Sequence, residues 1–262
     1  GKAISSLRKL GYDVKVGELS ALDNEIDLLI IASPVEPFKK EELDKIKDYL
    51  NRGGKVLLFL DLPEKVKELQ GLFSITLGDY LIHDPHHDPS LGPTAPFLDD
   101  YMNERVFKGR VYRVMMPTVR EIRFLHDAEF KYESIARVSS DSWKDVNGNH
   151  KLDKEDETTG LEDVTSLIEQ KEGLMKAVVL SDGDFASNAY IDLYENNAFF
   201  TGLVNWLTGE GTLVDIPPPE PVFVPMYVTP EQLRLVRLIG PVGLPALFVL
   251  SGLLVFLWRR RL

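Results

Sequence analysis

IDLLIIA, residues 26–32, is the stretch that decides the fold, because it is an apolar run with a single charge near its start. A strand of this composition is buried on both faces, which is typical of the centre of a parallel sheet. KVLLFLD, residues 55–61, and LMKAVVLS, residues 174–181, are two further runs of this kind. Such strands need helices on both faces of their sheet, so the sequence predicts an α/β fold.

Helical patterns lie between these runs. EPFKKEELDKIKDYLNRGG, residues 36–54, places apolar residues near helical spacing and ends on two glycines, as helices commonly do. YDVKVGEL, residues 12–19, has the pattern of a half-buried strand. Further helices are expected at residues 4–10, 64–73 and 198–207. This alternation predicts a doubly wound, mainly parallel sheet.

The alternation is interrupted at residues 76–170. This segment is rich in proline and aspartate, and it contains short β-like runs such as GRVYRVMM, residues 109–116, and YESIARVSS, residues 132–140. We therefore expect a β-rich insertion that packs on the sheet of one domain, residues 1–215.

The C-terminal end has the pattern of a membrane anchor. Residues 238–258 contain no charge and are followed at once by three arginines. Because about 20 apolar residues cross a bilayer, we expect a transmembrane helix at residues 235–258. Arginines concentrate on the cytoplasmic side, so residues 259–262 form a basic cytoplasmic tail and the domain is extracytoplasmic at the cell membrane. The prolines of residues 216–230 predict a semi-rigid stalk.

Composition excludes several classes of function. The net charge of −11 argues against nucleic acid as a partner, and the chain has no cysteine for disulfides, thiolate nucleophiles or cysteine-based zinc sites. The sequence has no GxGxxG, GxxxxGK[ST] or GxSxG motif, so we expect no nucleotide cofactor and no enzyme activity.

SDGDFASN, residues 181–188, directly follows a predicted buried strand. Ligands of doubly wound sheets bind at the carboxyl ends of the strands. The candidate ligand- or partner-binding residues are therefore Asp182, Asp184 and Asn188. A tight Asp-Gly turn explains the same residues without a ligand, and turn chemistry favours that interpretation.

HDPHHDP, residues 83–89, is a second polar segment. Its three histidines and two aspartates are ligand types for a transition metal, but adjacent histidines point different ways and the prolines indicate a loop. The sequence leaves open whether a metal binds to His83, His86 and His87, with Asp84 and Asp88.

DVNGNHKLDKED, residues 145–156, carries oxygen ligands at positions 1, 3, 5, 9 and 12 of a twelve-residue window, and a calcium loop adds the backbone carbonyl of position 7. The predicted calcium ligands are Asp145, Asn147, Asn149, Lys151 through its carbonyl, Asp153 and Asp156. His150 stands at position 6, where glycine is usual because φ is positive, and Asp156 has a shorter arm than glutamate. A solvated turn that needs no ion is the alternative.

Several stretches, in this order, carry a family resemblance: GYDVKVGEL with IDLLIIASP, GGKVLLFLD, VVLSDGDFASN with NNAFFTGLVNWLTGE, and the ending IPPPEPVFVPMYVTPEQLRLVRLIGPVGLPALFVLSGLLVFLWRRRL. The sequence resembles the auxiliary component of ABC transport systems described in gliding motility. The resemblance implies a membrane-anchored, glutamine-amidotransferase-like (flavodoxin-like) domain that is not catalytic. It also implies a permease and a separate ATPase as partners. Family members usually carry another span near the N-terminus, and Gly1 lies in what reads as a helix already under way, so we expect a preceding segment.

Three functions remain open. The first is a non-catalytic auxiliary subunit of an ABC-type transport complex that binds a ligand or partner protein outside the membrane. The second is a metal-dependent, membrane-anchored ectohydrolase, which needs Asp182, Asp184 and the histidines of residues 83–87 to converge on one metal. The third is a structural protein that anchors others to the cell surface.

Overall fold

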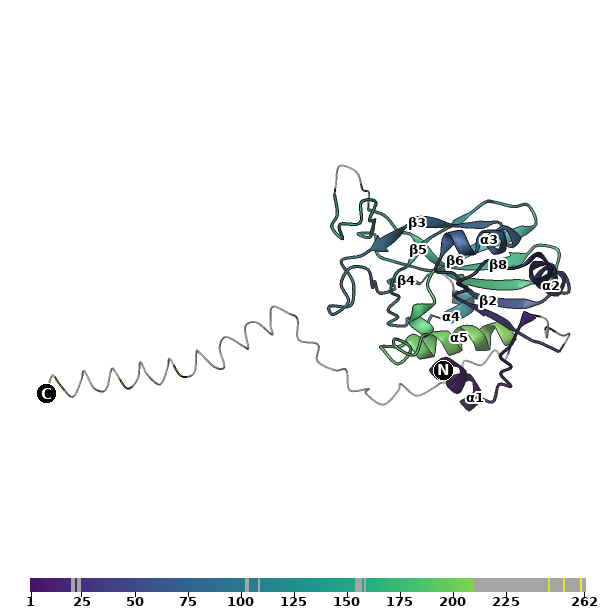
Figure 1. Cartoon of the computed structure of the whole chain (residues 1–262), viewed down its shortest axis with the longest axis horizontal. Helices are drawn as coiled ribbons and strands as arrows, with labels where there is room; N and C mark the ends of the chain where they lie inside the picture. The colour runs from purple at the N-terminus through teal and green to yellow at the C-terminus, as the bar shows by residue number, and fades with distance from the viewer. Residues whose placement is uncertain are drawn as a thin grey trace. The chain divides into compact units, whose positions relative to one another are not determined.

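The structure of the chain is a computed structural model (Figure 1). It describes residues 1–209 apart from 20–21, 23–24, 102–103, 108, 154–156 and 158, and beyond residue 209 it describes only positions 245, 252 and 260. The helices are α1 (Lys2–Lys9), α2 (Lys40–Asn51), η2 (Pro63–Lys65), α3 (Lys67–Leu72), α4 (Glu104–Phe107), η3 (Asp184–Ala186) and α5 (Asn196–Thr208). The strands are β1 (Leu29–Ala32), β2 (Lys55–Phe59), β3 (Ile75–His83), β4 (Asp100–Tyr101), β5 (Arg120–Phe124), β6 (Phe130–Arg137), β7 (Trp143–Lys144), β8 (Asp163–Gln170) and β9 (Lys176–Leu180).

The main sheet has six strands in the order β1-β2-β9-β8-β6-β4. The three runs that the sequence predicts as buried strands form its parallel half, because β2 pairs in parallel with both β1 and β9. The other half is antiparallel, from β9 through β8 and β6 to β4. The α/β class is confirmed, and the expectation of a mainly parallel sheet is corrected to a mixed sheet.

The length of one connection explains the change of direction. Residues 171–175 alone join β8 to β9. A parallel pair needs a crossover of a dozen or more residues, so a connection this short forces an antiparallel pair. The predicted insertion therefore does not only pack on the sheet: it contributes β8, β6 and β4 to it.

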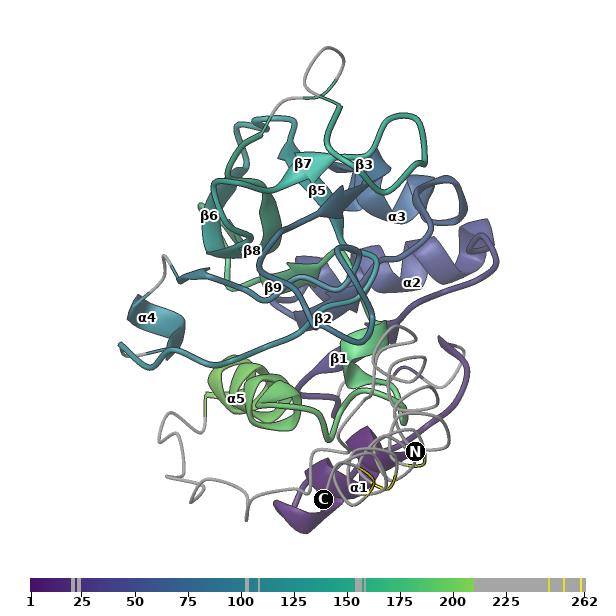
Figure 2. The same cartoon turned by 90° about the vertical axis from the view of Figure 1, so that its left-hand side faces the viewer.

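The core lies on both faces of the parallel half. Alternate side chains of β2 point to opposite faces, so Leu57 and Phe59 pack with α1 and α5, whereas Val56 and Leu58 pack with α2, α3 and β3. Figure 2 shows α5 on one side of β2 and β9, with α2 and α3 on the other. Each such fully buried side chain contributes about 1.5–3 kcal/mol of transfer free energy.

A second sheet has three strands in the order β5-β3-β7. β3 begins beside the α2 and α3 layer, where Ile75 and Leu77 are buried, and it ends at the buried His83. Its last two residues pair with β7, in the register His83 opposite Trp143 and Ile82 opposite Lys144. In this small sheet the end of β3 lies beside the start of the predicted calcium loop.

Two predicted strands are wrong. Residues 12–18 are described without strand structure, and GRVYRVMM, residues 109–116, forms only an isolated bridge at Met115. The stalk at 216–230 and the span at 235–258 lie outside the described residues, apart from positions 245 and 252. Among the helices that the structure describes, none is long and apolar enough to cross a membrane.

Candidate functional site

Asp182 lies in the turn that leaves β9, and its side chain is fully buried. One carboxylate oxygen accepts a hydrogen bond from the backbone N–H of Asp184 and the other accepts one from Phe185, each at 3.1 Å. Phe185 is itself buried between the sheet and α5. The carboxylate of Asp182 therefore fastens its own turn to the core.

The neighbouring strand ends complete this turn. The N–H of Gly183 donates to Oδ1 of Asp61, which follows β2, at 2.6 Å. A Cβ at position 183 would lie 1.9 Å from Oγ of Ser33, the residue after β1, so only glycine fits there. Ser33 has a φ of 49°, a conformation that few residues other than glycine adopt. Sequence reasoning missed Asp61 and Ser33, although Asp61 ends one predicted strand and Ser33 directly follows another.

Burial raises the pKa values of the acidic side chains in the turn. Burial, followed by the charge of Asp61, raises the pKa of Asp182 well above its ordinary value. The same two causes raise the pKa of Asp184. Asn188 makes a different contact, because its Oδ1 accepts a hydrogen bond from the N–H of Lys2 at 2.7 Å. The carboxylate of Asp182 therefore holds its own turn, whereas Asn188 holds the start of α1.

The three histidines of the HDPHHDP segment contact different residues. The Nδ1 atom of His86 lies 2.7 Å from Oδ2 of Asp99 on the surface, and Nδ1 of His87 lies 2.7 Å from the carbonyl of Asp84 in its own turn. The carboxylate of Asp84 is buried and binds Ser139. Of these three histidines, only His83 contacts residues of another candidate site.

His83 meets the predicted calcium loop. Its Nε2 lies 2.9 Å from Nδ1 of His150 and 3.4 Å from Oδ2 of Asp145. The side chain of His83 is fully buried, and its ring packs on Trp143 with the ring centroids 5.5 Å apart. Burial lowers the pKa of His83, and the charge of Asp145 opposes this shift. The β3–β7 pairing thus joins two motifs that are far apart in the sequence.

Asp145 is the acceptor around which the loop folds. Its Oδ1 accepts from the N–H groups of Gly148 and Asn149, at 2.8 and 3.2 Å. Its Oδ2 accepts from the N–H of His150 at 2.9 Å. Burial acts to raise its pKa, but these N–H donors and His83 outweigh burial, so the pKa is lowered. Asp145 therefore stays ionised, as a metal ligand requires.

Two asparagine side chains of the loop converge on Asp153. The Nδ2 atoms of Asn147 and Asn149 each donate to its Oδ2 at 2.6 Å. His150 has a φ of 60°, so position 6 makes the turn that the calcium window requires. Calcium binding requires the amide oxygens of both asparagines to take the inward places that Nδ2 atoms hold here. Asp156 lies outside the described residues.

Contacts that the sequence did not reveal close the base of the loop. Glu157 is buried, and its carboxylate accepts from the N–H of Val146 at 2.8 Å and of Asp153 at 3.0 Å. Trp143 bridges to Thr159 across the base. Position 157 lies one residue beyond the twelve-residue window, which is why the ligand spacing did not find it.

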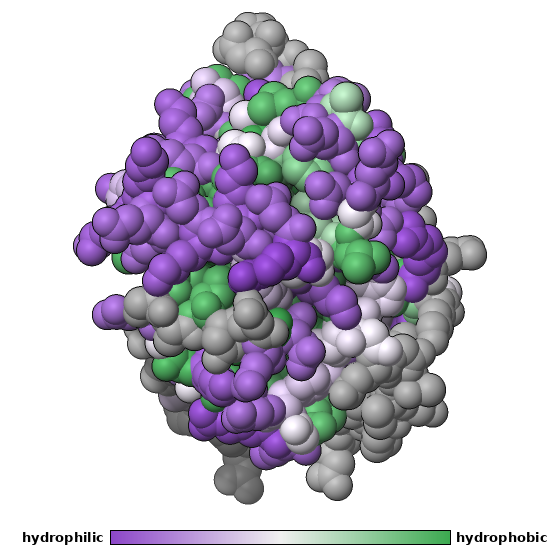
Figure 3. Space-filling model, turned by 90° about the vertical axis from the view of Figure 1, so that its right-hand side faces the viewer, coloured by the Kyte–Doolittle hydropathy of each residue, from purple (hydrophilic) through white to green (hydrophobic). Residues whose placement is uncertain are grey.

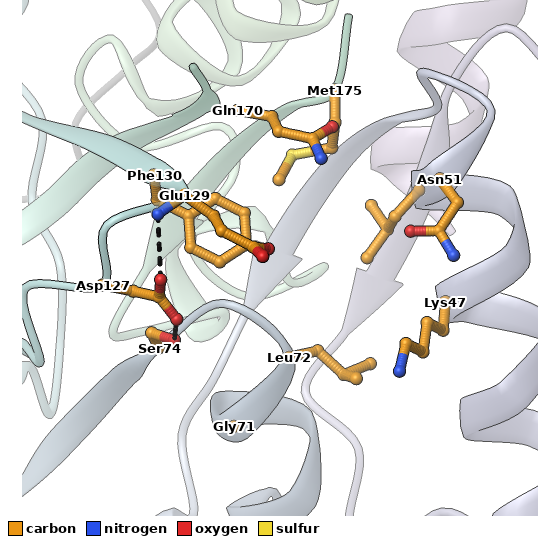
Figure 4. Close-up of a pocket in the computed structure, with 11 residues that line it drawn as sticks. Lys47, Asn51, Gly71, Leu72, Ser74, Asp127, Glu129, Phe130, Gln170 and Met175 are labelled. Atoms are coloured by element: carbon orange, nitrogen blue, oxygen red, sulfur yellow. Dashed lines mark hydrogen bonds between the residues drawn. The ribbon is translucent and has the colours of Figure 1, made fainter. Parts of the chain in front are cut away.

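A separate groove of about 210 Å³ opens at the amino ends of β2 and β9 (Figure 4). Lys47 and Asn51 of α2 face Glu129 and Phe130 across it, with Met175 at the base of β9. Its volume is below the roughly 300–1,000 Å³ of a usual small-molecule site. On the face that Figure 3 shows, hydrophilic residues predominate and hydrophobic residues form separate patches, as on an ordinary protein surface. Neither feature defines a binding site.

The fold and these contacts define an α/β domain with a polar loop at one corner. Comparison with known proteins finds a similarity to one family over part of the chain. The sequence model of a family described as an ABC-type uncharacterized transport system matches residues 2–70, from α1 to α3. This match supports an auxiliary component of an ABC-type transport system. No curated protein matches the sequence.

A solved structure shares the fold. The mmIFT52 N-terminal domain superposes with a TM-score of 0.60 at 16% sequence identity, covering 79% of this chain and 89% of that chain. The exo-beta-1,4-mannosidase Op5Man5 from Opitutaceae bacterium strain TAV5 gives a TM-score of 0.37 at 13% identity, covering 80% of this chain and 29% of that chain. The first similarity extends the α/β architecture to another protein, and the second is too low to define a common fold.

Proposed function

We propose that the chain is a non-catalytic auxiliary subunit of an ABC-type transport complex and that it binds a permease and an ATPase subunit. The family match at residues 2–70 carries this proposal. The turn at Asp182 supports the non-catalytic part, because both carboxylate oxygens are used to hold backbone N–H groups. Within the described residues, His83 bonds to the 145–150 loop instead of this turn, so the groups that a hydrolase would need to share do not converge.

Purification of the tagged full chain in mild detergent tests the complex. Permease and ATPase chains are expected to co-purify. Val35 lies in the matched region with 68% of its surface exposed, whereas Leu174 lies outside that region and is 79% exposed. Val35→Asp and Leu174→Asp thus place the same charge at two positions that are both largely exposed. Recovery of the chain without any transporter subunit would contradict the proposal, and loss only with Val35→Asp would locate the contact in the matched region.

We further propose that residues 235–258 anchor the chain and that the domain faces outward. The uncharged run before Arg259–Arg261 supports this orientation. Protease added to intact cells should then remove the domain. Digestion that occurs only after lysis would show the opposite orientation.

The loop at residues 145–156 is proposed to bind one calcium ion. The ionised Asp145, the side chains that converge on Asp153 and the positive φ of His150 all support this. Extracellular calcium modules have Kd values of roughly 10⁻⁴–10⁻³ M. An outward-facing loop would encounter calcium at concentrations in this range. The ion would order the loop and thereby stabilise it. At 10 to 100 times Kd, binding would raise the free energy of unfolding by about 1.4–2.7 kcal/mol.

A further inference from the structure

Three potential metal ligands meet where the end of β3 contacts the loop. They are Nε2 of His83, Nδ1 of His150 and Oδ2 of Asp145, and all lie within 4.8 Å of one another. The three separations are 2.9 Å between the two nitrogens, 3.4 Å from His83 to Asp145 and 3.6 Å from His150 to Asp145. Two imidazoles and a carboxylate are a ligand set that zinc and related transition metals accept.

The spacing of these atoms fits a tetrahedral ion. Ligands held 2.0–2.1 Å from a tetrahedral metal lie about 3.3–3.4 Å apart. The separations of 2.9, 3.4 and 3.6 Å average to that value. A point equidistant from the three atoms lies about 1.9 Å from each within their plane, so an ion at bonding distance sits about 0.7 Å above it. That height is the one expected for three corners of a tetrahedron, with the fourth corner free.

Burial differs among the three ligands in a way that suits an ion entering from solvent. The side chains of His83 and Asp145 are 1% and 3% exposed, so two ligands are fixed in the interior. The side chain of His150 is 63% exposed. The neighbouring ring of Trp143 and the backbone N–H groups that hold Asp145 orient the buried ligands before any ion arrives.

We propose that His83, His150 and Asp145 form a binding site for a transition metal of the zinc class, with a water molecule as the fourth ligand. The site is distinct from the calcium loop in its chemistry, because calcium takes oxygen ligands and imidazole nitrogen suits zinc. The two sites share Asp145, whereas Asn147, Asn149 and Asp153 belong to the loop alone. The metal would link the end of β3 to a residue 67 positions later in the chain.

Metal binding by the full chain in mild detergent, after removal of any affinity tag, tests the proposal. Zn²⁺ titration followed by calorimetry should show one site with a Kd of roughly micromolar or tighter. Co²⁺ substitution should give the strong visible absorption of a tetrahedral ion. His150→Ala is the critical variant, because this exposed side chain can be removed without disturbing the core. It should weaken Zn²⁺ binding roughly 100-fold or more, since it removes one of only three protein ligands.

Two control variants separate this site from its neighbours. His86→Ala removes a histidine of the same segment that contacts Asp99 instead, and it should leave Zn²⁺ binding unchanged. Asp153→Ala removes a loop carboxylate and should abolish calcium binding while Zn²⁺ still binds. His83→Gln should behave like His150→Ala, with its folding checked by circular dichroism.

The outcomes are distinguishable. No Zn²⁺ heat at high micromolar concentration would show that the histidine pair makes only a hydrogen bond, which would overturn the proposal. Equal Zn²⁺ affinity in His150→Ala and in the unmodified chain would overturn it as well. Loss of calcium binding alone bears on the loop, and failure to recover transporter subunits bears on the proposed function, so neither result would be mistaken for failure of the zinc site.

Discussion

Asp145 and Asp182 are both buried aspartates that begin a turn and accept backbone N–H groups, yet their environments differ. Asp182 is enclosed by Phe185 and the ends of the parallel strands, and the charge that raises its pKa most is that of another carboxylate, Asp61. Asp145 faces His83 and an exposed loop. The pKa is raised for Asp182 and lowered for Asp145. The same residue type therefore closes a structural turn in one region and is available to an ion in the other.

The largest difference is expected when the Asp182 side chain is removed. Asp182→Ala leaves the N–H groups of Asp184 and Phe185 without their acceptor in a buried turn, so it should lower the free energy of unfolding by about 2–3 kcal/mol. Urea unfolding of the metal-free protein measures the change. Asp192→Ala, which removes only an exposed ion pair with Lys2, is the control and should cost less than about 1 kcal/mol. An equal effect of the two substitutions would end the structural account of Asp182.

Lowering the pH should change the stability contributions of the two aspartates in opposite directions. The pKa of Asp182 is raised, so its contribution to stability is full below the ordinary value of 3.8 and declines as pH rises through the raised pKa. The pKa of Asp145 is lowered, so its contribution is full above 3.8 and is lost as pH falls through the lowered pKa. The free energy of unfolding is measured between pH 3 and pH 7 in the presence of a chelator. Comparing the unmodified protein with Asp182→Asn and with Asp145→Asn gives the contribution of each carboxylate.

The stability advantage of the unmodified protein over Asp182→Asn should grow as pH falls from 7 toward 4. Its advantage over Asp145→Asn should shrink below about pH 4. Each titrating group can contribute at most about 1.4 kcal/mol per pH unit. Curves that run parallel for both variants would show that the two carboxylates have the same environment, against the contacts described above.

The smallest effect is expected at the tip of the loop. Asp153→Ala removes the acceptor shared by Asn147 and Asn149, but these are exposed contacts. In the absence of metal it should change the free energy of unfolding by less than about 0.5 kcal/mol. In calcium the difference from the unmodified protein should widen, because only the unmodified loop gains stability from the ion. A large loss without calcium would instead make Asp153 a structural residue like Asp182.

Local patterns predicted the parts of the fold that local forces determine. The apolar runs at β1, β2 and β9 and the periodicity of α2 and α5 correspond to elements in the structure. The pairing of β8 with β9 was missed, although the five residues between these two strands require an antiparallel pair. Residues 12–18 alternate like a strand, but the structure describes no strand there, because alternation alone does not supply a neighbouring strand.

In the candidate site, too, local patterns predicted the local features and missed the contacts between distant residues. The loop window at Asp145 and the positive φ of His150 follow from the spacing of neighbours in the chain. The approach of His83 to His150 does not, since it depends on a two-residue pairing of β3 with β7 across 67 positions. The sequence left open whether the histidines of HDPHHDP bind one metal, and the structure gives each a different partner.

Calcium titration of the full chain, the Asp145→Ala variant and the Asp182→Asn variant shows directly which of the two aspartates takes part in ion binding. We predict one calcium site in the unmodified chain and in Asp182→Asn, with a matching rise in the thermal midpoint, and no binding in Asp145→Ala. Asp145→Ala removes the first ligand of the loop, whereas Asp182→Asn changes a turn that takes no part in it. No heat and no thermal shift at several times the expected Kd of roughly 10⁻³ M would contradict the account. A shift that survives Asp145→Ala would contradict it equally, because the ion would then bind elsewhere.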